Sequence, residues 1–163
     1  YLGHIISSEG VKADPSKIEA VRGWPVPRKK TEVHVFLVSA SYYRRFIKSF
    51  AEIARPLHQL TEKGENLIEE MCQQAFVALK SCLISAPVLA HPDPAKQFIL
   101  DTDASEVGIG AVLSQADGGV ERVVACASRS LTKQERKYAT TKKELLSMVT
   151  FTKHFKHYLL GAE

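Results

Sequence analysis

The chain has 163 residues, of which 45% are hydrophobic, and a formal net charge of +4 at pH 7. This apolar fraction is ordinary for a soluble globular protein, and the length suits one domain or two small ones. No run of about 18 apolar residues occurs, which excludes a membrane-spanning helix. The mild positive charge permits nucleic-acid binding. Three scattered cysteines without a C-x-x-C pair argue against a zinc site and fit a reducing compartment.

The first elements are a hairpin and two helices. A β-rich run over 1–6, followed by a turn and a short return, predicts a β-hairpin. Asp14 is placed to cap a helix and Pro15 suits a first helical turn, so we expect a short helix over 16–23. Thr31 is expected to cap the next helix. The apolar positions of that helix recur at helical spacing: Val33, Phe36, Leu37 and Ala40.

Residues 41–50 interleave aromatic and cationic side chains. Arginine and lysine neutralise phosphates and tyrosine packs on sugars or bases, so this stretch is a candidate nucleic-acid contact. The alternative is an amphipathic helix with a solvated cationic face and with Phe46 and Ile47 buried.

Two further helices are predicted over 50–61 and 69–83, with a loop over 63–66 between them. The second helix has one apolar face, which we expect in the core: Cys72, Ala75, Phe76, Leu79 and Leu83. Residues 85–97 contain three prolines and are the best candidate for a linker, so we place a domain boundary there.

Two aspartates, Asp101 and Asp103, end an apolar run that is followed by a small-residue turn and a second apolar run. The pattern predicts two adjacent strands, and because side chains alternate along a strand, both aspartates share one face. A divalent cation would stabilise an acid at the end of a buried strand, and Mg²⁺ prefers carboxylate oxygen. The alternative is that both aspartates simply cap the turn.

The residues that follow predict one more strand and two helices. A third strand is expected over 120–127, and the capping-box spacing of Thr132 and Glu135 predicts a short helical turn. A second capping box, Thr141 with Glu144, opens a helix to about residue 160. Glu144 then either folds back onto its cap or points toward the strand that carries the aspartates. Two histidines of this helix, His154 and His157, either bind a metal or lie on a solvated face.

Several stretches resemble the ribonuclease H domain of gypsy-type (Metaviridae) LTR retrotransposon reverse transcriptases in residue type, order and spacing: 102–105, 108–113, 127–132, 135–138 and 143–146. The upstream half resembles the end of the palm and the thumb of the same Pol polyproteins, so the resemblance covers nearly the whole chain. Two positions depart from the family pattern: Val38 stands where glycine is usual, and Ile68 where tryptophan is usual.

The resemblance implies hydrolysis of the RNA strand of RNA–DNA hybrids with two Mg²⁺ (or Mn²⁺) ions held by carboxylates. Asp103 matches the first-strand metal-bridging aspartate and Glu144 the helix glutamate, which makes them the predicted catalytic and metal-binding residues. Asp101 is off the family position. The family's other metal-site aspartates would follow Glu163, so we expect the isolated fragment to be inactive.

The resemblance also implies contacts with template–primer, because the thumb tracks the duplex and the palm hairpin grips the primer end. The predicted nucleic-acid-binding residues are Gly3, His4, Tyr42, Tyr43, Arg44, Arg45 and Lys48. Expected partners are the RNA–DNA hybrid, the template–primer duplex and the rest of the Pol polyprotein, with no membrane. The polyprotein parts are palm and fingers upstream, and the remainder of ribonuclease H with integrase downstream. The expected location is a cytoplasmic virus-like particle, with the nucleus as the alternative.

The expected fold class is α+β or α/β: a helical thumb-like segment, then an incomplete ribonuclease H-like mixed sheet with a packed helix. The expected domains are 1–63 (end of palm, primer-grip-like hairpin and thumb), 64–97 (connecting helix and proline-rich linker) and 98–163 (N-terminal part of a ribonuclease H-like domain). A competing hypothesis is a non-catalytic, decayed or domesticated retroelement fragment that binds nucleic acid or a protein partner, motivated by Val38 and Ile68. A free-standing ribonuclease H is disfavoured by the thumb-like half.

Overall fold

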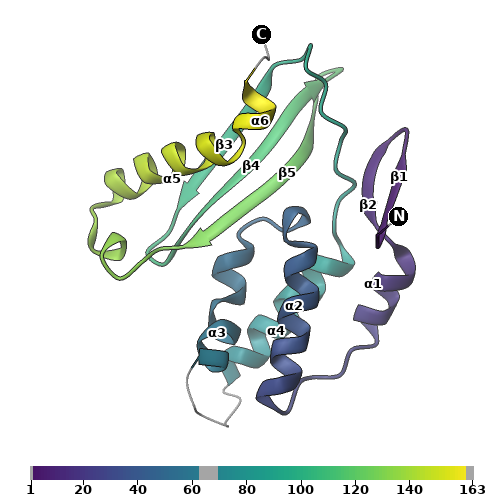
Figure 1. Cartoon of the computed structure of the whole chain (residues 1–163), viewed down its shortest axis with the longest axis vertical. Helices are drawn as coiled ribbons and strands as arrows, with labels where there is room; N and C mark the ends of the chain where they lie inside the picture. The colour runs from purple at the N-terminus through teal and green to yellow at the C-terminus, as the bar shows by residue number, and fades with distance from the viewer. Residues whose placement is uncertain (1, 63–69, 161–163) are drawn as a thin grey trace.

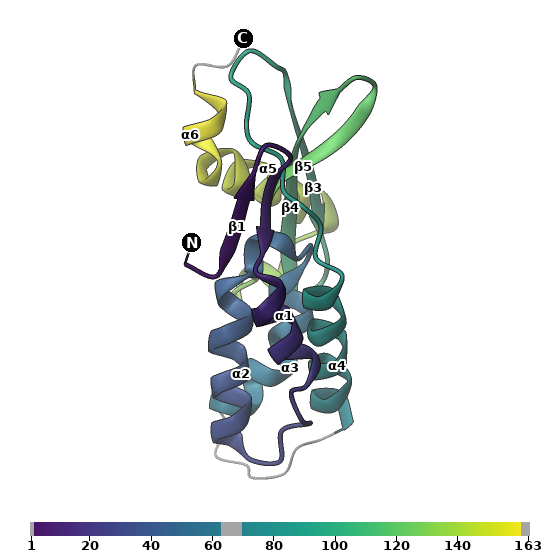
Figure 2. The ribbon, with the colours of Figure 1, turned by 90° about the vertical axis from the view of Figure 1, so that its right-hand side faces the viewer.

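The computed structural model describes residues 2–62 and 70–160. Figure 1 shows a helical bundle at one end of the molecule and a twisted sheet with two covering helices at the other. Turned by a quarter, the molecule keeps this division into two stacked parts (Figure 2). None of the helices in the described parts of the chain is long and apolar enough to cross a membrane.

The chain starts with the predicted hairpin and helix. Strands β1 (His4–Ser7) and β2 (Gly10–Ala13) pair antiparallel, and α1 (Pro15–Arg22) follows. The Asp14 carboxylate accepts a 2.9 Å hydrogen bond from the Ser16 amide, which confirms the predicted cap.

The next helix, α2 (Lys30–Tyr42), has the predicted apolar face, whose four residues are all buried. The prediction that Thr31 caps it is wrong. A helix capped by Thr31 would begin at Glu32, whereas α2 begins two residues earlier, after Lys29, whose side chain makes no capping bond. Instead the Glu32 carboxylate accepts a 2.7 Å hydrogen bond from the Arg28 amide just before the helix, so an acid inside the first turn replaces the expected threonine.

The aromatic and cationic stretch is not one helix. α2 ends at Tyr42, a 3₁₀ turn η1 (Arg44–Phe46) follows, and α3 (Phe50–Glu62) begins after Ser49, whose φ is +56°. Phe46 and Ile47 are buried, as the amphipathic alternative required, but the chain reverses between the two helices. The cations of this stretch are therefore presented by a tight turn.

Helix α4 (Glu70–Ile84) buries the predicted apolar face against α2 and α3. The Phe36 and Phe76 rings lie 4.5 Å apart, and Trp24 packs edge-on against Phe36 at 5.6 Å. The predicted loop over 63–66 and the departure at Ile68 lie outside the described residues.

The segment between the halves is fastened to both. Val11 and Leu89 exchange backbone hydrogen bonds of 2.7 and 2.8 Å, and the Ala90 amide donates to the Val123 carbonyl at 2.7 Å. Leu89 is fully buried. Only glycine fits at Gly10, because its φ is +137° and a Cβ there would lie 2.1 Å from the Leu89 carbonyl oxygen. Leu89 of the linker segment thus pairs with Val11 of the hairpin as an isolated antiparallel β-bridge.

The sheet of the second half has the order β3-β4-β5, all antiparallel: β3 (Phe98–Ala104), β4 (Gly108–Asp117) and β5 (Val120–Ser130). α5 (Thr140–His154) and α6 (Lys156–Leu159) cover one face. Their core contains Ile109, Ala111, Leu113, Phe151 and Phe155. The predicted order of a helical first half followed by a sheet with a packed helix is confirmed, but the sheet of the described residues is antiparallel and not mixed as expected.

The two predicted capping boxes have different outcomes. The first is confirmed: the Thr132 amide donates to Glu135 at 2.8 Å, and the Glu135 amide donates to the Thr132 hydroxyl at 3.3 Å, where η2 (Glu135–Lys137) begins. The second is wrong. α5 begins at Thr140 after Ala139 without a side-chain cap, so Glu144 does not fold back onto a cap. The helix also breaks after His154, before α6.

Candidate metal and nucleic-acid site

Asp101 and Asp103 are both exposed on β3 and alternate with less exposed neighbours, as the strand prediction required. Neither caps the turn between β3 and β4. The Ser105 hydroxyl does so, accepting hydrogen bonds from the Val107 amide at 3.3 Å and from the Gly108 amide at 3.0 Å. The turn-capping alternative is therefore excluded, and both carboxylates stay available to solvent.

One buried hydroxyl fastens α5 to the aspartate strand. Ser147 is fully buried, and its Oγ donates to the Asp103 carbonyl at 3.1 Å and to the Gly110 carbonyl at 3.2 Å. Glu144 lies three residues earlier, which is one helical turn away, and is exposed. The backbone of Asp103 and the helix that carries Glu144 are thus in contact at one end of the sheet.

The Asp103 side chain belongs to the sheet face opposite α5. The register aligns Asp103 with Gly110 and Gly110 with Ser128, so these three positions share one face. Their apolar neighbours in sequence form the other face, against α5. The Ser128 hydroxyl accepts a 2.9 Å hydrogen bond from the Ala51 amide of α3, and Glu52 and Asp103 line one small recess there. Asp103 therefore faces the helical bundle, whereas α5 with Glu144 covers the other face, so the structure holds the Glu144 helix on the Asp103 strand without showing the two carboxylates together.

The predicted ligands are of the chemical type that Mg²⁺ prefers, but there are too few of them for a complete site among the described residues. Asp103 and Glu144 offer carboxylate oxygens, the ligands that this hard cation prefers. Across residues 2–62 and 70–160, however, no three histidine, cysteine, aspartate or glutamate side chains gather closely enough to hold a metal ion. Among the described residues, Asp103 and Glu144 are therefore two candidate ligands without a third beside them.

Four of the predicted nucleic-acid-binding residues form one aromatic cluster at the hairpin. The Tyr43 hydroxyl donates to the Gly3 carbonyl at 3.1 Å, and Tyr43 is only 7% exposed. The His4 ring stacks on Phe46 and lies 5.2 Å from the ring of Tyr42, which is 52% exposed. Tyr43 thus fastens the hairpin to the end of α2, while Tyr42 keeps an open face.

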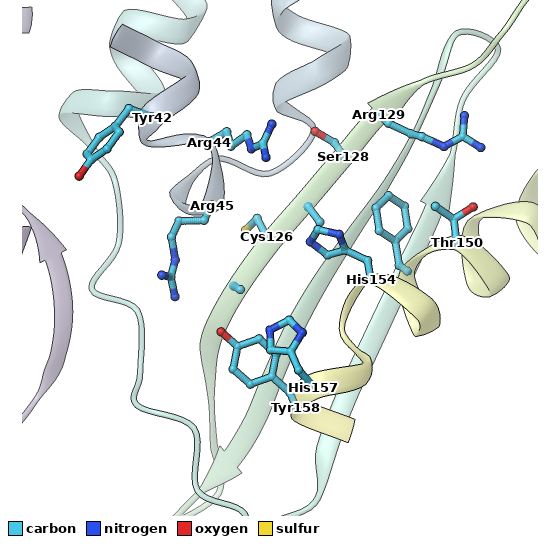
Figure 3. Close-up of a pocket in the computed structure, with 13 residues that line it drawn as sticks. Tyr42, Arg44, Arg45, Cys126, Ser128, Arg129, Thr150, His154, His157 and Tyr158 are labelled. Atoms are coloured by element: carbon cyan, nitrogen blue, oxygen red, sulfur yellow. The ribbon is translucent and has the colours of Figure 1, made fainter. Parts of the chain in front are cut away.

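The predicted cations lie between the two halves. Arg44, Arg45 and Lys48 are exposed, and the two arginines line a cavity of about 380 Å³ between η1, β5 and the α5–α6 corner. Figure 3 shows both arginines at this cavity together with His154, His157 and Tyr158. The sequence did not predict this cavity, because no local pattern connects positions more than a hundred residues apart.

The chain matches a known protein family over its second half and the helix before it. A family model described as the RNase H-like domain found in reverse transcriptase matches residues 68–163. The chain belongs to this family of reverse-transcriptase RNase H-like domains. The chain is also similar to Pol polyproteins of Drosophila melanogaster retrotransposons: 42% identical to that of transposon opus and 42% to that of transposon gypsy, over 99% of this chain. It spans only 17% and 16% of their lengths.

A solved structure confirms the fold over both halves. The foamy viral protease–reverse transcriptase in complex with RNA/DNA hybrid matches 99% of this RNase H-like chain and 22% of its own length, with a TM-score of 0.81 and 22% sequence identity. At that identity the likeness establishes the fold alone. The helical bundle and the sheet are therefore arranged as in one continuous segment of a reverse transcriptase, which agrees with the similarity to Pol polyproteins.

Proposed function

We propose that this chain is the part of a retrotransposon Pol polyprotein that joins the reverse transcriptase thumb to the front of its ribonuclease H domain. In this proposal residues 1–63 end the palm and form the thumb, 64–97 connect, and 98–163 begin the ribonuclease H domain. The observation that carries it is the contact made by Ser147, which holds the Glu144 helix on the Asp103 strand beside a helical bundle rich in exposed cations.

Within that enzyme the chain would bind the RNA–DNA hybrid and contribute Asp103 and Glu144 to its hydrolysis. Divalent ions at such a site activate a water molecule and stabilise the leaving oxygen. The two carboxylates would hold these ions, and further ligands from the rest of the Pol polyprotein would complete the site. The cations of η1 would neutralise backbone phosphates. We place this activity in a cytoplasmic virus-like particle.

The test combines the chain, a labelled RNA–DNA hybrid and Mn²⁺ or Mg²⁺ at about 50 and 200 mM salt. We expect salt-sensitive binding and no cleavage, because the described residues add no third metal ligand to Asp103 and Glu144. Paramagnetic broadening by Mn²⁺ of NMR signals near Asp103 should vanish in Asp103→Asn. It should persist in the matched control Asp101→Asn, which removes an equally exposed carboxylate from the same strand face.

Two outcomes would contradict parts of this proposal. Cleavage that disappears in Asp103→Asn would mean that the chain completes its metal site, for example by dimerisation, and is an enzyme alone. Neither binding nor cleavage, together with broadening that both variants retain, would instead support the non-catalytic retroelement fragment.

A further inference from the structure

The cavity between the two halves has walls from three separate parts of the chain. Arg44 and Arg45 extend from the η1 turn, Ser128 and its neighbours come from β5, and His154 and His157 come from the corner between α5 and α6 (Figure 3). Its volume is about 380 Å³, which is within the range of sites for small molecules or single nucleotides.

The charged side chains that line this cavity are all positive. Arginine is ionised at all ordinary pH values, and of the described residues that line the cavity none is an aspartate or glutamate. Arg129 also lines it, but its guanidinium is already engaged by both carboxylate oxygens of Glu135, each at 2.9 Å. Arg44 and Arg45 are therefore the cations that would interact with an anion in the cavity.

His154 adds a side chain whose charge depends on pH. Burial, then the neighbouring His157 and Arg44, lower the pKa of His154 below its usual value of 6.5. His154 thus lies in the same positive field as the arginines, and a bound anion would offset that field. Aromatic surface is present as well, because Tyr42, which is 52% exposed, also lines the cavity.

From this combination we propose that the cavity binds a backbone phosphate and an adjacent base of single-stranded nucleic acid. Arg44 and Arg45 neutralise the phosphate, and Tyr42 stacks on the base, which every nucleotide allows. This assignment rests on the proposed function and adds a second contact, on the β5 side of the sheet, to the site at Asp103. A strand held here would lie across both halves of the chain.

The experiment measures binding of a fluorescein-labelled oligothymidylate of about ten nucleotides by anisotropy. We expect the Arg44→Gln/Arg45→Gln variant to bind roughly tenfold or more weakly and to show a shallower salt dependence. The matched control is Arg22→Gln, which removes the same kind of side chain from an exposed position on α1 and should change affinity less than about twofold. Equal weakening in variant and control would overturn the proposal.

The pH dependence gives a readout that a purely structural role of the arginines would not produce. The groups facing the histidines are Arg44 and Arg45 from η1, and Cys126 and Arg129 from β5. Burial raises the pKa of the Cys126 thiol to about 11, so this thiol stays neutral over the range in which His154 gains its proton. Affinity should rise as the pH falls below about 6.5, because the pKa of His154 is lowered, and His154→Gln should flatten this rise. A rise that persists in this variant would contradict the assignment.

Competition distinguishes the sources of the phosphate. Thymidine 5′-monophosphate or inorganic phosphate that displaces the oligonucleotide at equal concentration would overturn the strand assignment in favour of a free-nucleotide or phosphate site. A double-stranded probe that binds the cavity as tightly as the single strand would also overturn it. Loss of binding in the Asp103→Asn chain alone, with the arginine variant unaffected, would count against this cavity. Failure of metal binding at Asp103 would count only against the proposed function.

Discussion

The hydroxyl of Ser147 allows the packing of α5 on the sheet to be tested by one substitution. Ser147→Ala removes the donor that the Asp103 and Gly110 carbonyls share and leaves the rest of the fully buried contact unchanged. Both distances exceed the usual hydroxyl–oxygen spacing, and one hydrogen serves two acceptors, so the pair is equivalent to a single ordinary bond.

The expected magnitude follows from opposing effects. Losing one such bond inside the protein, with acceptors left short of a partner, costs about 1.5 kcal/mol. Alanine regains about 0.5 kcal/mol in helix propensity relative to serine. The free energy of unfolding of Ser147→Ala should therefore fall by about 1 kcal/mol.

The assay is urea unfolding of the full chain followed by far-ultraviolet circular dichroism. Thr152→Ala is the control, because Thr152 is exposed on the same helix and alanine gains a similar propensity there. The two variants should differ in sign: Ser147→Ala destabilises, and Thr152→Ala is neutral or slightly stabilising. If Ser147→Ala lies within about 0.3 kcal/mol of the control, the hydroxyl does not hold α5 on the strand.

Two further predictions concern single contacts. Hydrogen bonding from Arg129, then from the Thr132 amide, lowers the pKa of Glu135 to about 2, so this stabilisation is present above about pH 4.5 and is lost as the pH falls toward 2. Glu135→Gln should cost about 1–2 kcal/mol at pH 7, reduced for the partial exposure of Arg129, and urea titrations should show the difference shrinking below pH 4.5; a constant difference would refute it. Tyr43→Phe, which removes the hydroxyl bound to Gly3, should lower Tm by about 2–4 °C, and an unchanged Tm would show that the hairpin is held otherwise.

Local patterns in the sequence predicted most of the secondary structure. The Asp14 cap, the box formed by Thr132 and Glu135, and the apolar faces of α2 and α4 all depend on neighbours within one or two turns. The failures came at Thr31 and Thr141, where threonine is suited to a cap but each helix begins two residues earlier than such a cap predicts. Capping preference is worth about 1 kcal/mol, which packing of the helix on its neighbours readily overrides.

The candidate site was only partly predictable, because it combines distant segments. Strand alternation correctly placed Asp101 and Asp103 on one face. Which face meets the helical bundle depends on the register of β3 on β4 and on the bond from Ala51 to Ser128, which are 77 residues apart. The cavity at Arg44 likewise exists only once the α5–α6 corner has packed against β5.

The proline-containing segment 85–97 has the composition of a flexible linker, yet the backbone hydrogen bonds of Leu89 and Ala90 fix it to both halves of the chain. A loose tether would let the two halves reorient, and a ligand touching both would lose binding free energy by arresting that motion. Here the backbone bonds of the segment hold the two halves in one orientation. The cations of η1 and the α5–α6 corner therefore form one preformed surface, and a ligand that contacts both would bind without first fixing the halves.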